Sequence, residues 1–434
     1  MARLAWQAAR RHFHQTERFQ LSCSAYYLPS DQYRPERPLL PGIVSLETLS
    51  EMRIIHACLV VTATLLLTCP AVASEHIRVL LLQGISEVGV SADRTVTLTL
   101  PSGRTRELNS RVRVAHGPSG LRVNGEAAHA GHITLSSAAT ELIVTSAATV
   151  MPVGGVVRVV DDGTSLQVIN DLDLEQYVKG VVPSEMNAGW HPEALKVQAV
   201  ATRTYALHQR MMNTMRNYDV VATVQDQVYR GRQRRDRRVE QAVESTRGIV
   251  LTFQNVPIFA AFSSTAAGPT EDAANVWAKD LPYLKGVDCP FDADSPYYQW
   301  RAPLKVRELE QTFRRQGVAV GDISGATIYS RSRAGRVTRV RFLHSQGELV
   351  IRAEELRRLV GYSVIPSTQF DLKFEEQELT LLGRGAGHGV GLCQWGAKEL
   401  AERGYSHQSI LRYYFPGTDL KDLRSLDFSA AAIP

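Results

Sequence analysis

The sequence predicts an α+β protein in which helices and a β-sheet core follow an N-terminal β-rich accessory domain. From His76 to about Val160, short alternating stretches such as Ile77–Leu81 are broken by glycine, asparagine and serine, as in consecutive strands and turns. Helical apolar spacing begins near Asp171, and further strand-like segments follow Gly248. The length of 434 residues, with 44% hydrophobic and 21% charged side chains, suffices for two or more globular parts.

The first part of the chain has the pattern of a leader. A start at Met52 precedes the apolar run Ile54–Cys69 and the small-x-small motif Ala71–Ala73. The run is shorter than the about 20 apolar residues of a membrane span, so cleavage is favoured over an uncleaved anchor. We expect a signal peptide over 52–73, an over-extended start over 1–51, and an extracytoplasmic protein with no membrane span after cleavage.

Charge and cysteine content narrow the partners only slightly. The net charge of +5 fits cell wall, nucleic acid or lipid equally well. The arginine-rich tract 230–238 has only Tyr229 as an adjacent aromatic residue, whereas nucleic-acid-binding segments usually interleave aromatic residues with cations. We interpret the tract as a solvated helix face, with attraction to an anionic wall polymer as the alternative, and expect no nucleic-acid partner.

Without the leader, two cysteines remain, Cys289 and Cys393. They are expected either to form a disulfide or to be two buried thiols.

Two predicted helices flank one short loop, Pro183–Trp190. Leu172–Val182 has helical apolar spacing and is expected to stop at Pro183. A second helix is expected to start at His191–Glu193, where proline suits the first helical position and glutamate suits the positive end of the helix dipole. A stripe at three- and four-residue spacing predicts the buried face of this helix: Val197, Val200, Thr204, Leu207 and Met211.

Strands and small residues dominate the later elements. Gly248–Phe262 predicts strands around a turn and leads into Ser263–Gly268, small residues that permit close approach of backbone or ligand. Leu379–Leu382 predicts a strand that enters the glycine-rich segment 383–391, and a helix is expected over Cys393–Arg403. The glycine spacing contains neither a dinucleotide nor a phosphate-loop motif, so nucleotide binding is not expected.

Glu185 is the sharpest candidate for catalysis. It lies in the loop between Pro183 and Gly189, which fix an unusual backbone path. Met186 and Trp190 offer apolar surface that would desolvate its carboxyl group and raise the pKa, as a general acid requires. The alternative is a glutamate that caps a helix, and the spacing alone does not separate the two roles.

Motif segments follow one another in a fixed order between about Val156 and Leu420: Leu174–Met186, Glu193–Ala206, Gln227–Tyr229, Phe262–Ser264, Trp277, Tyr283–Asp288 and His388–Ala397. Together they resemble the stage II sporulation protein D and amidase-enhancer family (SpoIID/LytB). The resemblance implies a catalytic or glycan-binding domain over 156–420 and a C-terminal tail over 421–434. The β-rich region 74–155 fits the family only loosely, and both a wall-binding module and a packed scaffold stay open for it.

The resemblance implies a lytic transglycosylase that cleaves the bond between N-acetylmuramic acid and N-acetylglucosamine, on strands stripped of stem peptides, with Glu185 as its catalytic residue. One carboxyl group suffices because the sugar's 6-hydroxyl attacks the anomeric carbon, whereas ordinary glycosidases need two. Glu175 is interpreted as a helix-surface residue. The motif polar groups expected around the glycan are Arg203, Tyr205, Gln227, Tyr229, Ser263, Ser264, His388 and Gln394. Each has a structural alternative, which for His388 is a helix cap.

The resemblance also bears on cofactors and partners. Some family members bind zinc through His and Cys near the Gln-Val-Tyr motif and the small-residue loop, but here Asp226 precedes Gln227, and residues 263–276 contain no Cys or His. We therefore expect no metal and no other cofactor, with the site held by packing or by a Cys289–Cys393 bridge. The rival function is a non-catalytic peptidoglycan-binding protein that enhances an N-acetylmuramoyl-L-alanine amidase, and a third is a transport or assembly scaffold.

Overall fold

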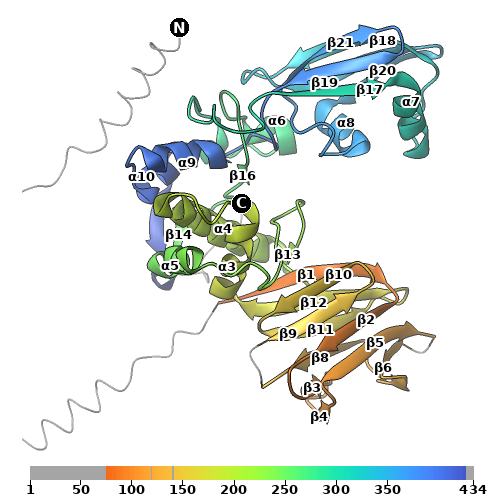
Figure 1. Ribbon diagram of the computed structural model, residues 1–434, viewed down its shortest axis with the longest axis vertical. Coiled ribbons are helices and arrows are strands. Elements are labelled where there is room, and N and C mark those ends of the chain that lie inside the picture. The colour runs from red at the N-terminus through yellow and green to blue at the C-terminus, as the bar shows by residue number, and fades with distance from the viewer. Residues whose placement is uncertain (1–74, 119, 139–140, 427–434) are drawn as a thin grey trace, which may run out of the picture. The chain divides into compact units, whose positions relative to one another are not determined.

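The structure is a computed structural model that describes residues 75–118, 120–138 and 141–426 (Figure 1). The predicted start at Met52, the signal peptide over 52–73 and the segment 1–51 lie outside this range. Helices and strands are mixed in several sheets, which confirms the predicted α+β class. No helix in the described part of the chain is long and apolar enough to cross a membrane.

The β-rich part is a sandwich of two sheets, drawn in orange to yellow in Figure 1. The strand orders are β13-β1-β12-β11-β8-β3-β4, in which β13 is Val220–Val221, and β10-β9-β2-β5-β6-β7. Its core comes from alternate residues of both sheets, such as Val90 and Val144 against Val159 and Val168. The strands are β1 (His76–Ile85), β2 (Glu87–Ser91), β3 (Val96–Thr99), β4 (Thr105–Leu108), β5 (Arg111–Gly117), β6 (Gly120–Val123), β7 (Glu126–Ala127), β8 (His132–Ser136), β9 (Leu142–Ser146), β10 (Thr149–Val153), β11 (Val156–Asp161) and β12 (Leu166–Asp173). The first sheet thus runs past the predicted boundary at residue 155.

Helix α3 (Leu174–Glu185) begins at Asp173, whose carboxylate accepts a hydrogen bond from a first-turn N–H at 3.0 Å. The expected end at Pro183 is wrong, because the helix continues through this proline to Glu185. Proline breaks a helix when it removes a hydrogen bond from the interior. Pro183 lies in the last turn and still removes one such bond, and the helix ends two residues later, with Glu185 at its C-terminal end.

Helix α4 (Pro192–Met212) confirms the second predicted helix. Pro192 is its first residue, and the His191 ring accepts a hydrogen bond from the Glu193 N–H at 3.2 Å. The predicted stripe is core, since Val197, Val200, Thr204 and Leu207 are buried and Met211 is half-buried. This helix forms the centre of the main core, against which α3 and the later elements pack.

Gly180 marks a close approach of α3 to the segment around Tyr229. A Cβ at Gly180 would lie 2.5 Å from a Tyr229 ring carbon and 2.7 Å from the Gly231 carbonyl oxygen. We expect Gly180→Ala to lower the free energy of unfolding by about 1–3 kcal/mol, because overpacking outweighs the gain in helix propensity. Urea denaturation measures this effect. Gly131→Ala is the control, since its Cβ meets nothing within 4 Å, and equal losses in both variants would contradict the close approach.

Residues 300–383 build a second core of their own, which was not predicted. Two three-stranded sheets, β17-β22-β21 and β18-β19-β20, enclose it together with two helices. Phe313 and Phe342 pack edge to face inside it, with ring centroids 5.5 Å apart. The elements are β17 (Trp300–Lys305), α7 (Val306–Arg315), β18 (Ile323–Arg331), β19 (Val337–His344), β20 (Gly347–Arg352), α8 (Ala353–Val360), β21 (Phe370–Glu375) and β22 (Glu378–Gly383).

The small-residue loop and the glycine-rich segment lie side by side in the main core. Phe262 of β16 pairs in parallel with Leu392 of β23. Gly389 has φ +76°, and a Cβ there would lie 2.2 Å from the Arg336 guanidinium, so the glycine repeat permits packing. The remaining elements are β13 (Val220–Val221), α5 (Arg237–Ser245), β14 (Ile249–Phe253), β15 (Val256–Pro257), β16 (Phe262–Ser263), α6 (Ala273–Trp277), β23 (Leu392–Cys393), α9 (Gln394–Glu402), α10 (His407–Tyr414), β24 (Asp419–Asp422) and two 3-10 turns. Strand β24 pairs with β14 across the predicted tail boundary.

Candidate active site

Glu185 is held by groups from two distant motifs. Its Oε1 accepts a hydrogen bond from the Val228 N–H at 2.7 Å, and the Gln394 side chain donates a second hydrogen bond to the carboxyl group. Val228 is the centre of the Gln-Val-Tyr motif, and Gln394 is the first residue of α9. Because His191 caps α4, the helix-cap alternative for Glu185 is wrong. Three motifs that are far apart in the sequence thus converge on one carboxyl group.

The surroundings of Glu185 favour its neutral form. Burial raises the pKa of Glu185, and its two hydrogen bonds lower it by less. The carboxyl group also lies at the C-terminal end of α3, where the helix dipole disfavours negative charge. Of the apolar residues expected beside it, Met186 is buried, and Trp190 packs edge to face on Trp395 with ring centroids 5.0 Å apart. A neutral, oriented carboxyl group suits a proton donor.

An open pocket of about 540 Å³ lies at Glu185, within the size range of ligand sites. Helix α5 begins only at Arg237, so the prediction that the whole arginine tract forms a helix face is wrong. Arg234 and Arg235 lie in the loop before α5 and line the pocket. The full lining is Pro183, Ser184, Glu185, Met186, Asn187, Ala188, Arg234, Arg235 and Asp236.

Asp236 is a second carboxyl group at the pocket, and it was not among the residues predicted from the sequence. Its side chain caps α5 by accepting a hydrogen bond from the Arg238 N–H at 2.8 Å, and it also binds the Arg238 guanidinium at 3.0 Å. The hydrogen bonds from Arg238 lower the pKa of Asp236. The sequence signal was an aspartate directly before a helix with strong amphipathic spacing. Its ionised carboxylate therefore already binds groups at the start of α5.

A buried chain of amides fixes Gln394. Its Nε2 donates to the Gln198 Oε1 at 3.3 Å, and the Gln198 Nε2 donates to the Thr202 hydroxyl at 3.2 Å. All three side chains are buried, and two of them belong to α4. A side-chain amide carries two N–H groups, so Gln394 can donate hydrogen bonds to Gln198 and to Glu185 at the same time. This places the predicted residue Gln394 directly at the candidate acid.

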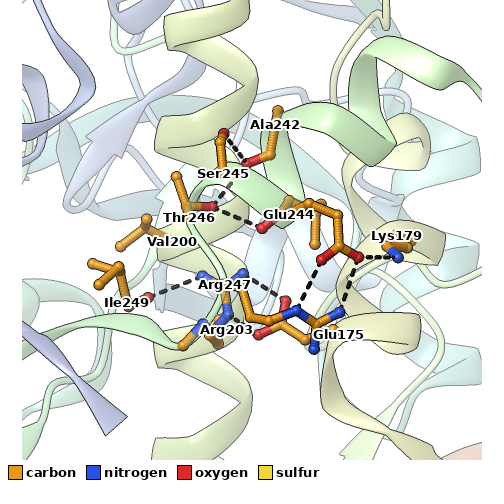
Figure 2. A network of polar contacts seen from close by, with 12 residues as sticks. Glu175, Lys179, Val200, Arg203, Ala242, Glu244, Ser245, Thr246, Arg247 and Ile249 are labelled. Carbon is orange, nitrogen blue, oxygen red and sulfur yellow. Dashed lines mark hydrogen bonds and ion pairs between the residues drawn. The ribbon is translucent and has the colours of Figure 1, made fainter. Parts of the chain in front are cut away.

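Arg203 is placed in the core and does not line the pocket. Its guanidinium forms a bidentate ion pair with Glu175 at 2.7 and 2.8 Å and donates to the Ile249 carbonyl at 2.9 Å (Figure 2). The Gly248 N–H donates to the same carboxylate at 3.1 Å. The prediction that Glu175 lies on the helix surface is therefore wrong: the residue is only 5% exposed. The pair ties α3 to α4 and to β14.

Three further predicted residues are buried as structural partners. The Tyr205 hydroxyl donates to the Asp226 carboxylate at 2.6 Å, and Gln227 accepts a hydrogen bond from a tyrosine hydroxyl at 2.9 Å. The Tyr229 hydroxyl donates to Asn170 at 2.9 Å. All three predicted side chains are at most 7% exposed. They fix the backbone on both sides of Val228, whose N–H donates to Glu185. They therefore orient the Glu185 carboxyl group indirectly, through the backbone.

The two predicted serines connect the small-residue loop to the glycine-rich segment. The Ser263 hydroxyl accepts a hydrogen bond from the Gly389 N–H at 3.2 Å. The Ser264 carbonyl accepts one from the Trp395 N–H at 3.1 Å. These bonds fix the start of α9, which carries Gln394.

His388 is an acceptor in the glycine-rich segment. Its Nδ1 accepts a hydrogen bond from the Val390 N–H at 3.0 Å, and its ring packs on Trp277 with centroids 4.8 Å apart. Burial, with the charges of two nearby arginines, lowers the pKa of His388 to about 3, so the ring is neutral at neutral pH. Cys393 caps α9, so the helix-cap alternative for His388 is wrong.

Cys289 and Cys393 are buried and are free thiols in the structure. Cys289 lies 3.2 Å from the Tyr414 hydroxyl, and Cys393 lies 3.3 Å from a carboxylate oxygen of Asp292. The predicted disulfide would join these two positions, and it stays a prediction. Asp292 was not among the residues that the sequence singled out.

Comparisons with known proteins match the segments that carry Glu185 and Val228 and a later part of the chain. A family model described as stage II sporulation protein (SpoIID) matches residues 162–253, and one described as a domain of unknown function (DUF8618) matches 272–391. An uncharacterized protein of Brachyspira hyodysenteriae is 34% identical over 255 residues, 58% of this chain and 68% of that protein. A stage II sporulation protein D of Bacillus subtilis is 33% identical over 275 residues, which covers 58% of this chain and 76% of the relative.

A further relative carries a different name. The amidase enhancer of Bacillus subtilis is 31% identical over 291 residues, which covers 56% of this chain and 40% of that protein. The motifs that converge on Glu185 and the extent of these matches lead to one conclusion. The chain belongs to the family of stage II sporulation protein D.

Proposed function

We propose that the protein is an exported lytic transglycosylase that cleaves the bond between N-acetylmuramic acid and N-acetylglucosamine in peptidoglycan. The observation that carries the proposal is a carboxyl group with a raised pKa at an open pocket, Glu185. The relatives support the same direction, since their names include stage II sporulation protein D and amidase enhancer, which fits a cell-wall-related role. The reaction would take place outside the cytoplasm, where the glycan strands lie.

In this mechanism Glu185 acts twice. As the neutral acid it protonates the glycosidic oxygen of the departing N-acetylglucosamine while the bond to the muramic acid C1 breaks. The resulting carboxylate then takes the proton of the 6-hydroxyl of the same muramic acid, whose oxygen attacks C1. The products are a 1,6-anhydro end and a free 4-hydroxyl, and Glu185 is neutral again. Hydrogen bonds from Val228 and Gln394 hold the carboxyl group in place in both states.

Ordinary glycoside hydrolysis is the chemical alternative at this pocket, because it uses two carboxyl groups. Asp236 also lines the pocket, but its carboxylate already binds the start of α5 and the Arg238 guanidinium. A carboxylate with these partners is a poor nucleophile or base. The geometry therefore favours the mechanism with one carboxyl group.

Product analysis tests the proposal. The mature protein is incubated with purified glycan strands from which the stem peptides have been removed, and the products are identified by mass spectrometry. We expect 1,6-anhydro-muramic ends. Reducing muramic ends, which contain the elements of one more water molecule, would contradict the proposal and indicate hydrolysis. Heat-denatured protein is the control for pre-existing anhydro ends.

A non-catalytic role is the rival, and the relative named amidase enhancer favours it. In that case the strands bind but stay intact. Addition of the protein to an N-acetylmuramoyl-L-alanine amidase would then accelerate the release of stem peptides, and Glu185→Gln would leave this acceleration unchanged. An acceleration without any anhydro product would replace our proposal with the enhancer function.

The arginines at the pocket predict a preference for stripped strands. Removal of a stem peptide leaves a carboxylate on the lactyl group of muramic acid, and Arg234 lies at the pocket with no carboxylate partner among the described residues. We expect Arg234→Ala to raise the KM for stripped strands about fivefold, equivalent to about 1 kcal/mol for an exposed ion pair. Arg237→Ala, in the same tract but outside the pocket lining, is the control. Equal KM values for both variants would contradict a role of Arg234.

A further inference from the structure

A buried cluster of metal-ligating side chains lies in the main core. Cys289, Asp292 and Cys393 bring their sulfur and carboxylate oxygen atoms within 4.8 Å of one another. The exposed fractions of these residues are 2%, 1% and 1%. Cys289 and Asp292 have the spacing Cys-x-x-Asp in one loop, whereas Cys393 directly precedes α9. A disulfide between the two cysteines would explain the sulfur atoms but not the carboxylate.

Asp292 has one oxygen atom that no neighbour satisfies. Its Oδ2 accepts a hydrogen bond from the Ala267 N–H at 2.8 Å and lies 3.3 Å from the Cys393 sulfur. Its Oδ1 is buried and has no hydrogen-bond partner among the described residues. Buried carboxylates are normally paired with a cation or coordinate a metal ion. The unsatisfied oxygen therefore indicates a ligand that belongs between these side chains.

The Cys393 sulfur contacts two backbone donors as well as the Asp292 carboxylate and the Ser264 carbonyl. It accepts hydrogen bonds from the Ala266 N–H and the Gly396 N–H, each at 3.4 Å, and it caps the N-terminus of α9. Backbone N–H groups and the positive end of a helix both stabilise a thiolate. The thiolate is the form of cysteine that binds metal ions. Burial and the neighbouring Cys289 and Asp292 nevertheless raise the pKa of the Cys393 thiol, so the thiolate would form only as a metal ion displaces its proton.

The spacing and the charges fit zinc. Tetrahedral zinc, with Zn–S of about 2.3 Å and Zn–O of about 2.1 Å, separates its donors by about 3.6–3.8 Å. The ligand atoms of the cluster lie within 4.8 Å of one another, and the Cys393 sulfur lies 3.3 Å from Asp292 Oδ2. The Tyr414 hydroxyl, 3.2 Å from the Cys289 sulfur, is an oxygen atom near the fourth position. Arg336 is fully buried, donates to the Ala266 carbonyl at 2.8 Å and interacts electrostatically with Cys393. The charge of Zn²⁺ would offset two of the three negative charges of two thiolates and one carboxylate, and the Arg336 guanidinium, which also interacts with Glu271 and Glu354, lies nearby.

We propose that Cys289, Asp292 and Cys393 bind one Zn²⁺ ion, with release of the two thiol protons. Two thiolate ligands exclude the oxygen-seeking ions Mg²⁺ and Ca²⁺ and favour zinc. The sequence predicted no metal, because the positions around Gln227 and the small-residue loop lack ligands and because neither cysteine lies in a Cys-x-x-Cys unit. The fold nevertheless brings both cysteines and Asp292 together. The ion would join the Cys289 loop to the start of α9, so Gln394, the next residue, would be fixed relative to Glu185. Its role would be structural, and it takes no part in the proposed cleavage.

Metal content and thiol count test this site together. The full exported chain is purified without chelator, zinc is measured by elemental analysis, and thiols are counted after unfolding with chelator and without reductant. We expect about one zinc ion and two thiols per chain. Substitution of cobalt should produce a thiolate-to-metal charge-transfer absorption. Removal of zinc by chelation should lower the melting temperature, and addition of Zn²⁺ should restore it.

Asp292→Asn keeps the shape of the side chain and removes one ligand, so we expect its zinc affinity to fall by about 100-fold or more. Asp288→Asn, in the same loop but exposed, is the matched control and should bind zinc as the unmodified protein does. If Asp292→Asn does not fold, the melting temperature of chelated wild-type protein, measured with and without added Zn²⁺, still tests whether the site binds zinc. Three results would overturn the proposal: two thiols without zinc, no thiols because a disulfide has formed, or equal zinc in the Asp292 variant, which indicates an adventitious ion only.

Discussion

Glu185→Gln is expected to reduce the formation of anhydro products by about 10²–10⁴-fold, the usual contribution of a general acid and base. Glutamine keeps the size of the side chain and can still accept the hydrogen bond from Val228. However, it cannot donate a proton to the glycosidic oxygen or take one from the 6-hydroxyl. Mass spectrometry of the products from stripped strands measures the loss. Glu240→Gln, an exposed carboxylate on α5, is the control and should keep full activity.

The pH dependence of this variant gives a second readout. The folded-state pKa of Glu185 is raised above its unfolded value. The stability that the neutral carboxyl group contributes is therefore present below the unfolded pKa and is lost as the pH rises through the folded pKa. Glutamine does not titrate, so Glu185→Gln should gain stability relative to the wild type over this range. Wild-type activity should fall over the same range. A stability difference that is constant with pH would contradict the burial of the acid.

Removal of either partner of the Arg203–Glu175 pair is expected to lower the free energy of unfolding by about 3–5 kcal/mol. The two side chains are 0% and 7% exposed, and a buried charge without its partner carries a large desolvation cost. We expect Arg203→Met and Glu175→Gln to show this loss in urea denaturation. The double variant Arg203→Met with Glu175→Leu should recover much of it, because two apolar side chains leave no buried charge.

An exposed ion pair provides the matched comparison. Arg358→Ala breaks the pair with Glu355, whose side chains are 54% and 40% exposed, and should cost at most about 1 kcal/mol. The experiment also separates the two roles of Arg203. If Arg203 instead binds the glycan, Arg203→Met will raise KM while the free energy of unfolding stays close to the wild-type value.

Local patterns in the sequence were enough to predict the main helices and to make Glu185 a candidate, whereas its catalytic role was implied only by the resemblance to the family. The His191–Glu193 start predicted α4, because capping and proline preference act within one turn. The alternating stretches predicted the strands of the β-rich part for the same reason, since burial alternates along each strand. Glu185 stood out because its neighbours offered apolar surface, and the structure places a carboxyl group with a raised pKa there.

Contacts between residues that are far apart in the chain could not be predicted from the sequence. Glu175 resembled a surface residue because Arg203, which neutralises it, follows 28 positions later. Asp292 stood apart from any motif, since its neighbour Cys393 lies 101 positions away. Asp236 was hidden within the arginine tract. In each case the decisive contact depends on how the chain folds back on itself, and no local rule of composition or spacing reports it.

The bond between Gln394 and Gln198 joins residues that are 196 positions apart. Closing such a long loop has an entropic cost, and folds with contacts of this kind form slowly. Synthesis starts at the N-terminus, so α3 can form long before the last quarter of the chain has been made. Until then the carboxyl group has no amide from α9 beside it, so partial chains and truncated products should lack the proposed activity.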